Sequence, residues 1–453
     1  MKRFLIYLLI ALMAVACGEE TEVQTELELL KNYCTASSNA DYYAALESTL
    51  PNDIFTNKKI VACGQSSHGS HENFEIQIEL FKYLVARNGC RTFVIEGNYS
   101  SILVVNKYVN GATYSKQEVM RNLGFWTWDT EEVWEMIRWM REYNQKTTEE
   151  NRIIFLGNDV QIVRECAKGV AAFFEDYDTL KGEVVLKLLQ PLLNDSTNYY
   201  SNQDSKSLSI FSNSLEKIKE LANEVQSAQK NPLDAKFVMA KYSINILQQS
   251  LIVSGMDFAG YVECRDSMMA ENVKWITSAK LRNGLIYLWA HNGHIQKQES
   301  GSARMGYYLD EWYRNQYFAI GVDFAEGRIN ASQPLHDTLS ATPSRNDFSK
   351  PKPGTIDLDT TCLAFLVRHR GTGVTYFDVA SSRTNDRFRK SKLFMDAKLH
   401  SVGAVFNPEA GINGHSRYLQ EVNLERHFDG ILFFEKSTPT KLLCTPKDVV
   451  HGN

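Results

Sequence analysis

Four short apolar segments, each followed at once by polar or ionisable side chains, restrict the fold of this chain more than any other feature. They span residues 59–63, 92–95, 152–156 and 285–290 and are rich in β-branched or aromatic side chains. Such segments predict strands buried on both faces, as in a parallel sheet covered by helices. We therefore predict an α/β fold with a largely parallel sheet flanked by helices.

The residues that follow these segments carry most of the candidate chemistry. The following residues are 64–72 (GQSSHGSHE), 96–98 (EGN), 157–159 (GND) and 291–294 (HNGH). The carboxyl ends of parallel strands lie along one edge of a sheet, where ligands bind. Between residues 59 and 96 the pattern predicts strand, helix and parallel strand, with Ser70 as the N-cap of the helix. His68 and Glu96 would then lie at the same edge of the sheet, on neighbouring strands. Imidazoles and carboxylates distant in sequence should therefore meet at that edge.

Length and composition limit the possible organisation and partners. At 453 residues, the chain is long enough for two domains or for one elaborated domain. We expect a tether and an N-terminal helix at 17–50, then an α/β domain at 51–440 with a helical insertion or lid at about 163–260. Arg265 and Asp266 are predicted to lie at the start of the next helix, facing the site. A net charge of -5 argues against nucleic-acid binding.

The N-terminus resembles a bacterial lipoprotein signal. Lys2 and Arg3 precede an apolar stretch at 4–15 that is too short to span a bilayer, and small residues lead to Cys17. This resemblance implies removal of residues 1–16, lipidation of Cys17 and export to the cell envelope, with the lipid as the only membrane contact. An ordinary signal peptide cut after Ala16 is the alternative. The other cysteines form no C-x-x-C pair, so we expect no disulfide framework.

The chain has two closely spaced histidine pairs, His68 with His71 and His291 with His294, and three kinds of chemistry fit them. In the first, His68 is a general base held by Glu96 or a neighbour, and Arg265 with His291 stabilises an oxyanion. In the second, the imidazoles bind a divalent metal together with carboxylates. In the third, the loop binds an anionic or sugar-like ligand without converting it. The carboxylates available to a metal are Glu72, Glu96 and Asp159.

Two familiar hydrolase patterns are missing. No G-x-S-x-G elbow surrounds Ser66 or Ser67, and the sequence after His71-Glu72 lacks the second histidine of H-E-x-x-H. The sequence therefore argues against a serine hydrolase and against a zincin metalloprotease.

Seven blocks in this chain resemble the ordered signature of the erythromycin esterase family. They are 64–69 (GQSSHG) with Glu72, 94–98 (VIEGN), 125–128 (FWTW), 157–159 (GND), 265–273 (RDSMMAENV), 289–294 (WAHNGH) and Met305-Gly306. The resemblance implies an α/β fold with a helical insertion, and hydrolysis of an ester or macrolactone by histidine-activated water without an obligatory metal or cofactor. It also implies that His68 is the base and that Glu96, Arg265 and His291 belong to the pocket.

One position departs from the family pattern. The family loop usually begins Gly-Glu, and here Gln65 takes the place of the glutamate. Glutamine can form hydrogen bonds but carries no charge, so Glu72 or Glu96 would have to supply one, or the activity is altered or lost. We read His71 as structural or pocket-lining rather than catalytic. The supporting, substrate-binding set is predicted to be Gln65, Glu72, Trp128, Asp266 and His294.

These observations together predict a lipid-anchored α/β hydrolase that cleaves an ester or lactone in a small or medium-sized molecule. No cofactor and no nucleic-acid partner are expected. Two alternatives stay open: a metal-dependent hydrolase using the same pocket, and a surface lipoprotein that binds a ligand without turnover. The second alternative is favoured by Gln65.

Overall fold

The computed structural model describes residues 26–194, 205–228, 235–254, 256, 258–278, 284–298, 303–335, 348–367, 373–406 and 418–443. The expected signal segment and Cys17 lie outside these residues. Among the helices in the described ranges, none has both the length and the apolar character needed to cross a membrane.

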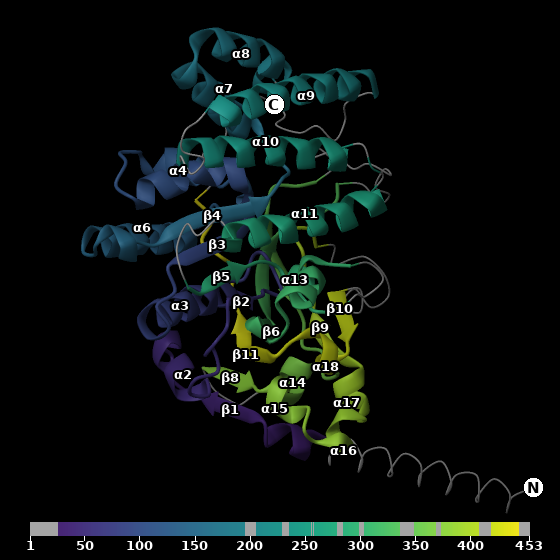
Figure 1. Cartoon of the computed structure of the whole chain (residues 1–453). Coiled ribbons are helices and arrows are strands. Elements are labelled where there is room, and N and C mark those ends of the chain that lie inside the picture. Colours follow the sequence, from purple (N-terminus) through teal and green to yellow (C-terminus); the bar gives the residue numbers. More distant parts are fainter. Residues whose placement is uncertain are drawn as a thin grey trace, which may run out of the picture.

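A nine-stranded sheet forms the centre of the described structure (Figure 1). Its strands run in the order β1 (Cys34–Ser37), β8 (Val374–Phe377), β11 (Gly430–Ser437), β6 (Tyr317–Ala331), β2 (Ile60–Cys63), β5 (Ile286–Trp289), β3 (Thr92–Asn98) and β4 (Ile154–Asp159), and β7 (Lys352–Ile356) pairs with β6. All neighbours from β11 to β4 are parallel, whereas β1, β7 and β8 pair antiparallel. The predicted α/β fold with a largely parallel sheet is confirmed.

The four apolar segments correspond to β2, β3, β4 and β5, with two differences from the prediction. First, β3 and β4 continue to Asn98 and Asp159, so Glu96 and Asp159 lie within strands rather than in the turns after them. Second, β5 lies between β2 and β3. The two strands of the predicted strand-helix-strand unit are therefore parallel but not adjacent, and a segment almost two hundred residues later fills the gap between them.

Helices cover both faces of the sheet because side chains alternate between its faces. Val61 and Cys63 face one core and Ile60 and Ala62 face the other. Against the first face pack α2 (Tyr42–Thr49), α3 (His71–Arg87), α4 (Tyr99–Val109) and α6 (Glu131–Gln145), and against the second pack α11 (Phe258–Ser278) and α13 (Met305–Tyr313). The Ser70 hydroxyl accepts a bond from the Asn73 amide at the start of α3, which confirms the predicted N-cap.

Between β4 and α11 most of the described residues are helical. The four helices are α7 (Arg164–Tyr177), α8 (Thr179–Asn194), α9 (Ser205–Ala228) and α10 (Ala235–Ser254), which share a separate apolar core and stack above α4 and α11 in Figure 1. The prediction for Arg265 and Asp266 was wrong in one respect. Because α11 begins at Phe258 and continues through Gly260, both residues lie well inside the helix rather than at its start.

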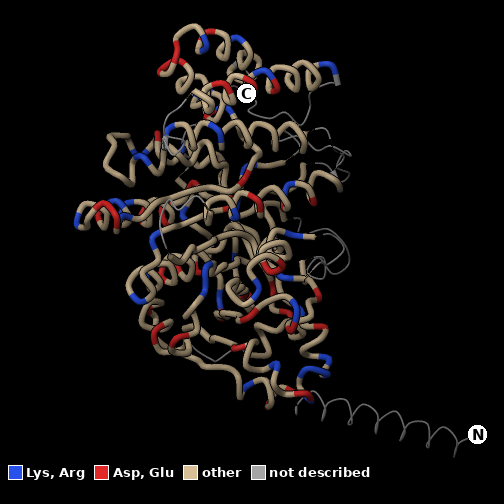
Figure 2. Tube along the Cα trace, viewed as in Figure 1, with Lys and Arg blue, Asp and Glu red and all other residues tan. Residues whose placement is uncertain are grey.

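The remaining described elements are short. They are α5 (Lys116–Arg121), α12 (Asn292–Ile295), α14 (Leu363–Val367), α15 (Val379–Ser382), α16 (Asp386–Arg389), α17 (Lys392–Met395), α18 (Leu424–His427), the 3-10 turns η1 (Trp126–Trp128), η2 (Glu149–Asn151) and η4 (Arg314–Gln316), and a two-stranded sheet of β9 (Ala397–His400) and β10 (Leu419–Val422). Acidic and basic residues intermingle along the described chain (Figure 2), which matches the small net charge.

Candidate active site

Four adjacent parallel strands bring the predicted residues together at their carboxyl ends. Gln65 and His68 follow β2, His291 follows β5, Glu96 lies in β3 and Asp159 ends β4. In a parallel sheet these ends share one edge. At this edge β5 lies between β2 and β3, so the order of the strands in the sheet departs from their order in the chain.

The Glu96 carboxylate is the centre of a network of hydrogen bonds. Its Oε2 accepts from the backbone N–H of His291 at 2.9 Å, and its Oε1 lies 3.1 Å from Nη2 of Arg265 and 3.2 Å from Nε2 of His294. Burial opposes ionisation of Glu96, but the positive charges of His294 and Arg265 outweigh it and hold the pKa of this carboxyl well below its usual value. Glu96 is therefore an anion fixed in position at neutral pH.

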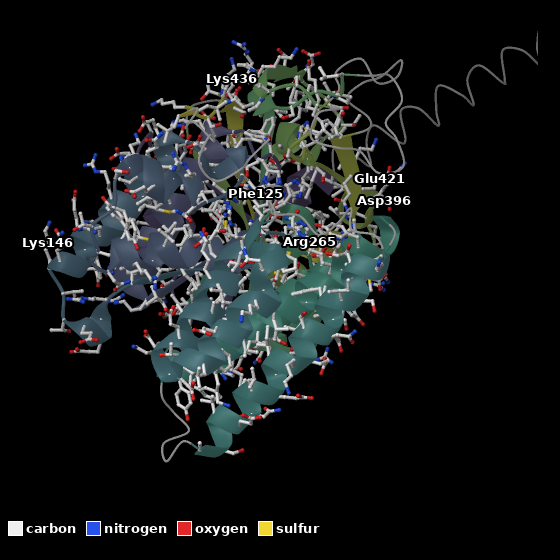
Figure 3. The ribbon with its side chains drawn as sticks, turned by 90° about the horizontal axis from the view of Figure 1, so that it is seen from above. Phe125, Lys146, Arg265, Asp396, Glu421 and Lys436 are labelled. Carbon is white, nitrogen blue, oxygen red and sulfur yellow. The ribbon has the colours of Figure 1, made fainter. Side chains whose placement is uncertain are left out.

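Arg265 joins Glu96 to Asp159. Its Nε and Nη2 donate to the two oxygens of Asp159 at 3.0 and 2.8 Å, a two-point contact that fixes the plane of the guanidinium group. Burial works against the charge of Arg265, but Asp159 and then Glu96 keep its pKa well above the usual value. Figure 3 shows Arg265 in the interior, whereas Lys146 and Lys436 lie at the periphery.

His294 lies between two carboxylates. Its Nδ1 is 2.7 Å from Oδ1 of Asp266, and its Nε2 faces Glu96. Burial would lower the pKa of His294, but the charges of Asp266 and Glu96 raise it to about 10. Asp266 also accepts bonds from the Arg304 side chain at 3.2 Å and from the Met305 amide at 2.9 Å. His294 is thus an imidazolium at neutral pH, and its charge offsets those of the neighbouring carboxylates.

We expect the free energy of unfolding to decrease at alkaline pH because His294 loses its proton there. A histidine whose pKa is raised by folding stabilises fully below its ordinary value of 6.5, and the stabilisation is lost as the pH rises through about 10. The free energy of unfolding, measured by urea denaturation from pH 6 to 10, should therefore decline more steeply for the wild type than for His294→Gln. Equal slopes for the two proteins would contradict the assignment of a charged His294.

The other two rings of the site, His68 and His291, are neutral. Their centroids are 5.2 Å apart. Burial lowers both pKa values, and the neighbouring His68 and His294 rings help to lower that of His291 to about 3. The Gly293 amide donates to Nδ1 of His291 at 3.1 Å, so the proton of this neutral ring resides on Nε2. That Nε2 is buried and makes no hydrogen bond of normal geometry to the described residues, although the nearby Ser66 backbone acts to raise the pKa of the ring.

His68 is held by Gln65, which corrects the expectation that Glu96 orients it. Nδ1 of His68 is 2.6 Å from the amide nitrogen Nε2 of Gln65, and the amide oxygen accepts from Nε1 of Trp289 at 2.9 Å. Glu96 lies on the strand beyond β5, and its oxygens are occupied by other donors, so it acts on His68 by charge alone. Sequence reasoning missed Trp289, although it opens one of the quoted blocks.

Two ionisable side chains from the first turn of α3, Glu72 and His71, lie outside this network. Both oxygens of Glu72 accept bonds from Thr438, from its backbone N–H at 2.6 Å and its hydroxyl at 2.7 Å. Glu72 thus joins the start of α3 to the segment after β11, and it does not supply the substrate contact or the charge that the sequence suggested. His71 pairs with Glu132 at 2.6 Å, in line with a structural role.

Trp128 contributes to the site through its indole. Its Nε1 donates to the carbonyl oxygen of Glu96 at 3.0 Å, and its ring lies 6.3 Å from that of His68 in an edge-on arrangement. Because Trp128 is almost fully buried, this contact positions β3 rather than presenting the ring to a ligand. The predicted substrate contact for Trp128 is therefore replaced by a supporting one.

Two glycines of the site are required by close packing. A Cβ on Gly64 would lie 2.0 Å from Oδ1 of Asn292, whose amide bridges to the backbone of Val322 on β6. A Cβ on Gly306 would lie 2.1 Å from the carbonyl oxygen of Ile295. These contacts seat the short helix α12, and with it His291 and His294, against the sheet.

A cavity of about 460 Å³ opens beside the two histidines that follow β5. Its lining residues are His291, Gly293, His294, Gln296, Arg304, Ser401, Leu419 and Gln420. The last three come from β10 and the residue after β9, and no pattern in the sequence indicated them. Among the described residues, no group of three or more His, Cys, Asp or Glu side chains is arranged to share a metal ion.

The fold and this site define an α/β protein with a carboxylate and histidine cluster at the strand ends. The chain belongs to the erythromycin esterase family of hydrolases, which it matches over residues 85–437. That match begins after the loop with Gln65 and His68.

Individual relatives agree with this membership. The erythromycin esterase type II of Escherichia coli is 23% identical over 418 residues, covering 86% of this chain and 92% of the relative. The YbfO protein of Bacillus subtilis is 21% identical over 420 residues, covering 86% of each chain. Among solved structures, a Bacillus cereus protein has a TM-score of 0.77 at 19% identity, covering 92% of this chain and 98% of its own. An erythromycin esterase mutant in its open conformation has a TM-score of 0.66 at 17% identity, covering 90% and 99%.

Proposed function

We propose that this protein hydrolyses a carboxylic ester or lactone, with His68 and His291 as the groups that act on the substrate. The observation that carries the proposal is the pair of neutral rings 5.2 Å apart beside the ionised, firmly held Glu96. A neutral imidazole can take a proton from water, and a neutral imidazole N–H can polarise a carbonyl.

The proposed reaction assigns both proton transfers to His68 and stabilisation of the oxyanion to His291. His68 removes a proton from water as the oxygen attacks the ester carbon, and the resulting tetrahedral oxyanion accepts a hydrogen bond from Nε2–H of His291. Protonated His68 then gives the proton to the leaving alkoxide, which departs as an alcohol and leaves the acid. Glu96 favours the transient imidazolium because its charge opposes the lowering of the His68 pKa by burial.

Arg265 has a positioning role in this proposal rather than the oxyanion contact that the sequence suggested. Its Nε and Nη2 are directed to Asp159 and Glu96, so its main effect is to hold two carboxylates within one rigid unit. His294 acts in the same way, because it contacts the same oxygen of Glu96 as Arg265 does and also contacts Asp266.

The cavity, which is lined by His291 but not by His68, suggests what kind of ester would fit. Apart from Leu419 and a glycine, its lining side chains are polar, and a volume of about 460 Å³ is suited to a small or medium-sized ligand. We therefore expect a polar ester or lactone to be a better substrate than a large apolar one.

A panel of chromogenic esters, lactones and macrolides of graded size and polarity tests this function. We expect turnover that is fastest for the small polar members, is unaffected by a chelator, and is lost in His68→Ala. Loss of activity with the chelator and its recovery with Zn²⁺ would support the metal-dependent alternative. Absence of product for every compound, from the wild type and from Gln65→Glu, would refute the proposal.

The contact between Gln65 and His68 favours a second candidate, ligand binding without turnover. The amide supplies no negative charge to the ring, and charge next to a catalytic histidine is what increases its basicity. Calorimetry that detects ester binding while mass spectrometry detects no product would support this candidate.

A further inference from the structure

The Gln65 side chain is enclosed between Trp289 and His68. It is completely buried, its oxygen Oε1 faces Nε1 of Trp289 at 2.9 Å, and its nitrogen Nε2 faces Nδ1 of His68 at 2.6 Å. These two contacts use the two ends of one amide group.

The chemistry of the tryptophan determines which end of the amide faces which partner. An indole N–H can only donate a hydrogen bond, so the Gln65 atom that meets it is the carbonyl oxygen. The NH₂ group is then directed at Nδ1 of His68, where it can only donate. Nδ1 is therefore an acceptor, and the single proton of neutral His68 resides on Nε2.

The packing around Trp289 keeps its indole N–H directed at the Gln65 amide. The Trp289 ring is fully buried and contacts Phe74 and Trp128 edge-on, with centroid distances of 4.9 and 5.3 Å. If the amide turned over, its NH₂ would face the indole N–H and both donors would lose their acceptors. A buried donor without a partner is strongly disfavoured.

We propose that Gln65, oriented by Trp289, holds resting His68 in the tautomer with its proton on Nε2. His291 is set in the same tautomer by the Gly293 amide, so the resting site presents two imidazole N–H donors. Such a site is suited to bind a carbonyl or carboxylate oxygen through hydrogen bonds. To accept a proton from water, Nε2 of His68 must be unprotonated, so water activation proceeds from the minor tautomer, which has its proton on Nδ1. This last consequence rests on the proposed function, but the tautomer itself does not.

Nuclear magnetic resonance of the full-length protein labelled with ¹⁵N-histidine tests the tautomer directly. We expect His68, assigned by its disappearance in His68→Asn, to carry its proton on Nε2. In Gln65→Glu the carboxylate accepts from both Trp289 and Nδ1 of His68, so the proton should move to Nδ1. A wild-type spectrum with the proton on Nδ1, or no change in Gln65→Glu, would overturn the proposal.

A tryptophan pair provides a matched control. Trp289→Phe removes the donor that orients Gln65, so His68 should show a mixture of tautomers. Trp139→Phe, on α6, alters a tryptophan that packs against Phe81 and Tyr143 and should leave the His68 signals unchanged. Unchanged signals in correctly folded Trp289→Phe would also count against the proposal.

Turnover provides an independent reading. Because a well-placed general base contributes roughly 10²- to 10⁴-fold, we expect Gln65→Glu to raise kcat by about 10-fold or more with little change in KM. A tautomer change without hydrolysis by either protein would refute the proposed function and leave the tautomer assignment intact. An unchanged kcat together with an unchanged tautomer would refute the assignment.

Discussion

Replacement of His68 by alanine is expected to lower kcat/KM for ester hydrolysis by about 10²- to 10⁴-fold, the usual contribution of a general base. The fold should persist because the side chain is only partly buried and its hydrogen bond in the structure is to Gln65. Initial rates on the best substrate of the panel, together with circular dichroism and urea denaturation, measure both effects.

The matched control for this variant is His71, the first residue of α3. His71→Ala removes a histidine three residues away that pairs with Glu132, and it should leave kcat/KM near the wild-type value even if stability falls. In the Gln65→Glu background the loss caused by His68→Ala should be larger, because the gain from the glutamate acts through His68. Full activity in His68→Ala, or an equal loss in His71→Ala, would exclude His68 as the base.

Replacement of Arg265 by methionine is expected to destabilise the protein by about 3–5 kcal/mol, the range for breaking a buried ion pair from one side. Among the described residues, Arg265 is the one side-chain cation that pairs with Asp159, which has no exposed side-chain surface, and it is one of two that pair with Glu96. Urea denaturation at pH 7 measures the change in the free energy of unfolding.

An exposed arginine and a double variant test the physical reason for this effect. Arg138→Met breaks a solvent-exposed pair with Glu135 on α6 and should change stability by less than about 1 kcal/mol. Adding Asp159→Asn to Arg265→Met should restore part of the loss, because it removes the uncompensated charge. If Arg265→Met changed the free energy of unfolding by less than about 1 kcal/mol, the ion pairs of Arg265 would contribute no more than exposed ones.

The strands of the site could be predicted because their signal is local. Each of the four apolar segments is long enough for one strand and ends in polar residues, and Ser70 carries its own capping signal. The family resemblance added that His68, Glu96, Arg265 and His291 belong together. The structure brings all four to one sheet edge, although their catalytic roles remain predictions.

The pairing of side chains within the site could not be predicted in the same way. Glu96 was expected to hold His68, but β5 lies between β2 and β3 and so separates the strands that carry the two residues. Gln65 contacts His68 instead, and Glu96 contacts Arg265 and His294. Glu72 was expected to join the cluster, but Thr438, more than three hundred residues later, takes its carboxylate. The partners of both carboxylates are near them only after folding, whereas Gln65 is three residues from His68 in the sequence.

By itself, the sequence determined which residues are available for chemistry and which strands carry them, because apolar periodicity and capping depend on neighbours along the chain. Tertiary structure alone decided which atom faces which: that Trp289 turns the amide of Gln65, that His294 is charged between two carboxylates, and that β10 lines the cavity. Hydrogen-bond direction and pKa depend on distance and burial, which exist only once the strands are packed in order.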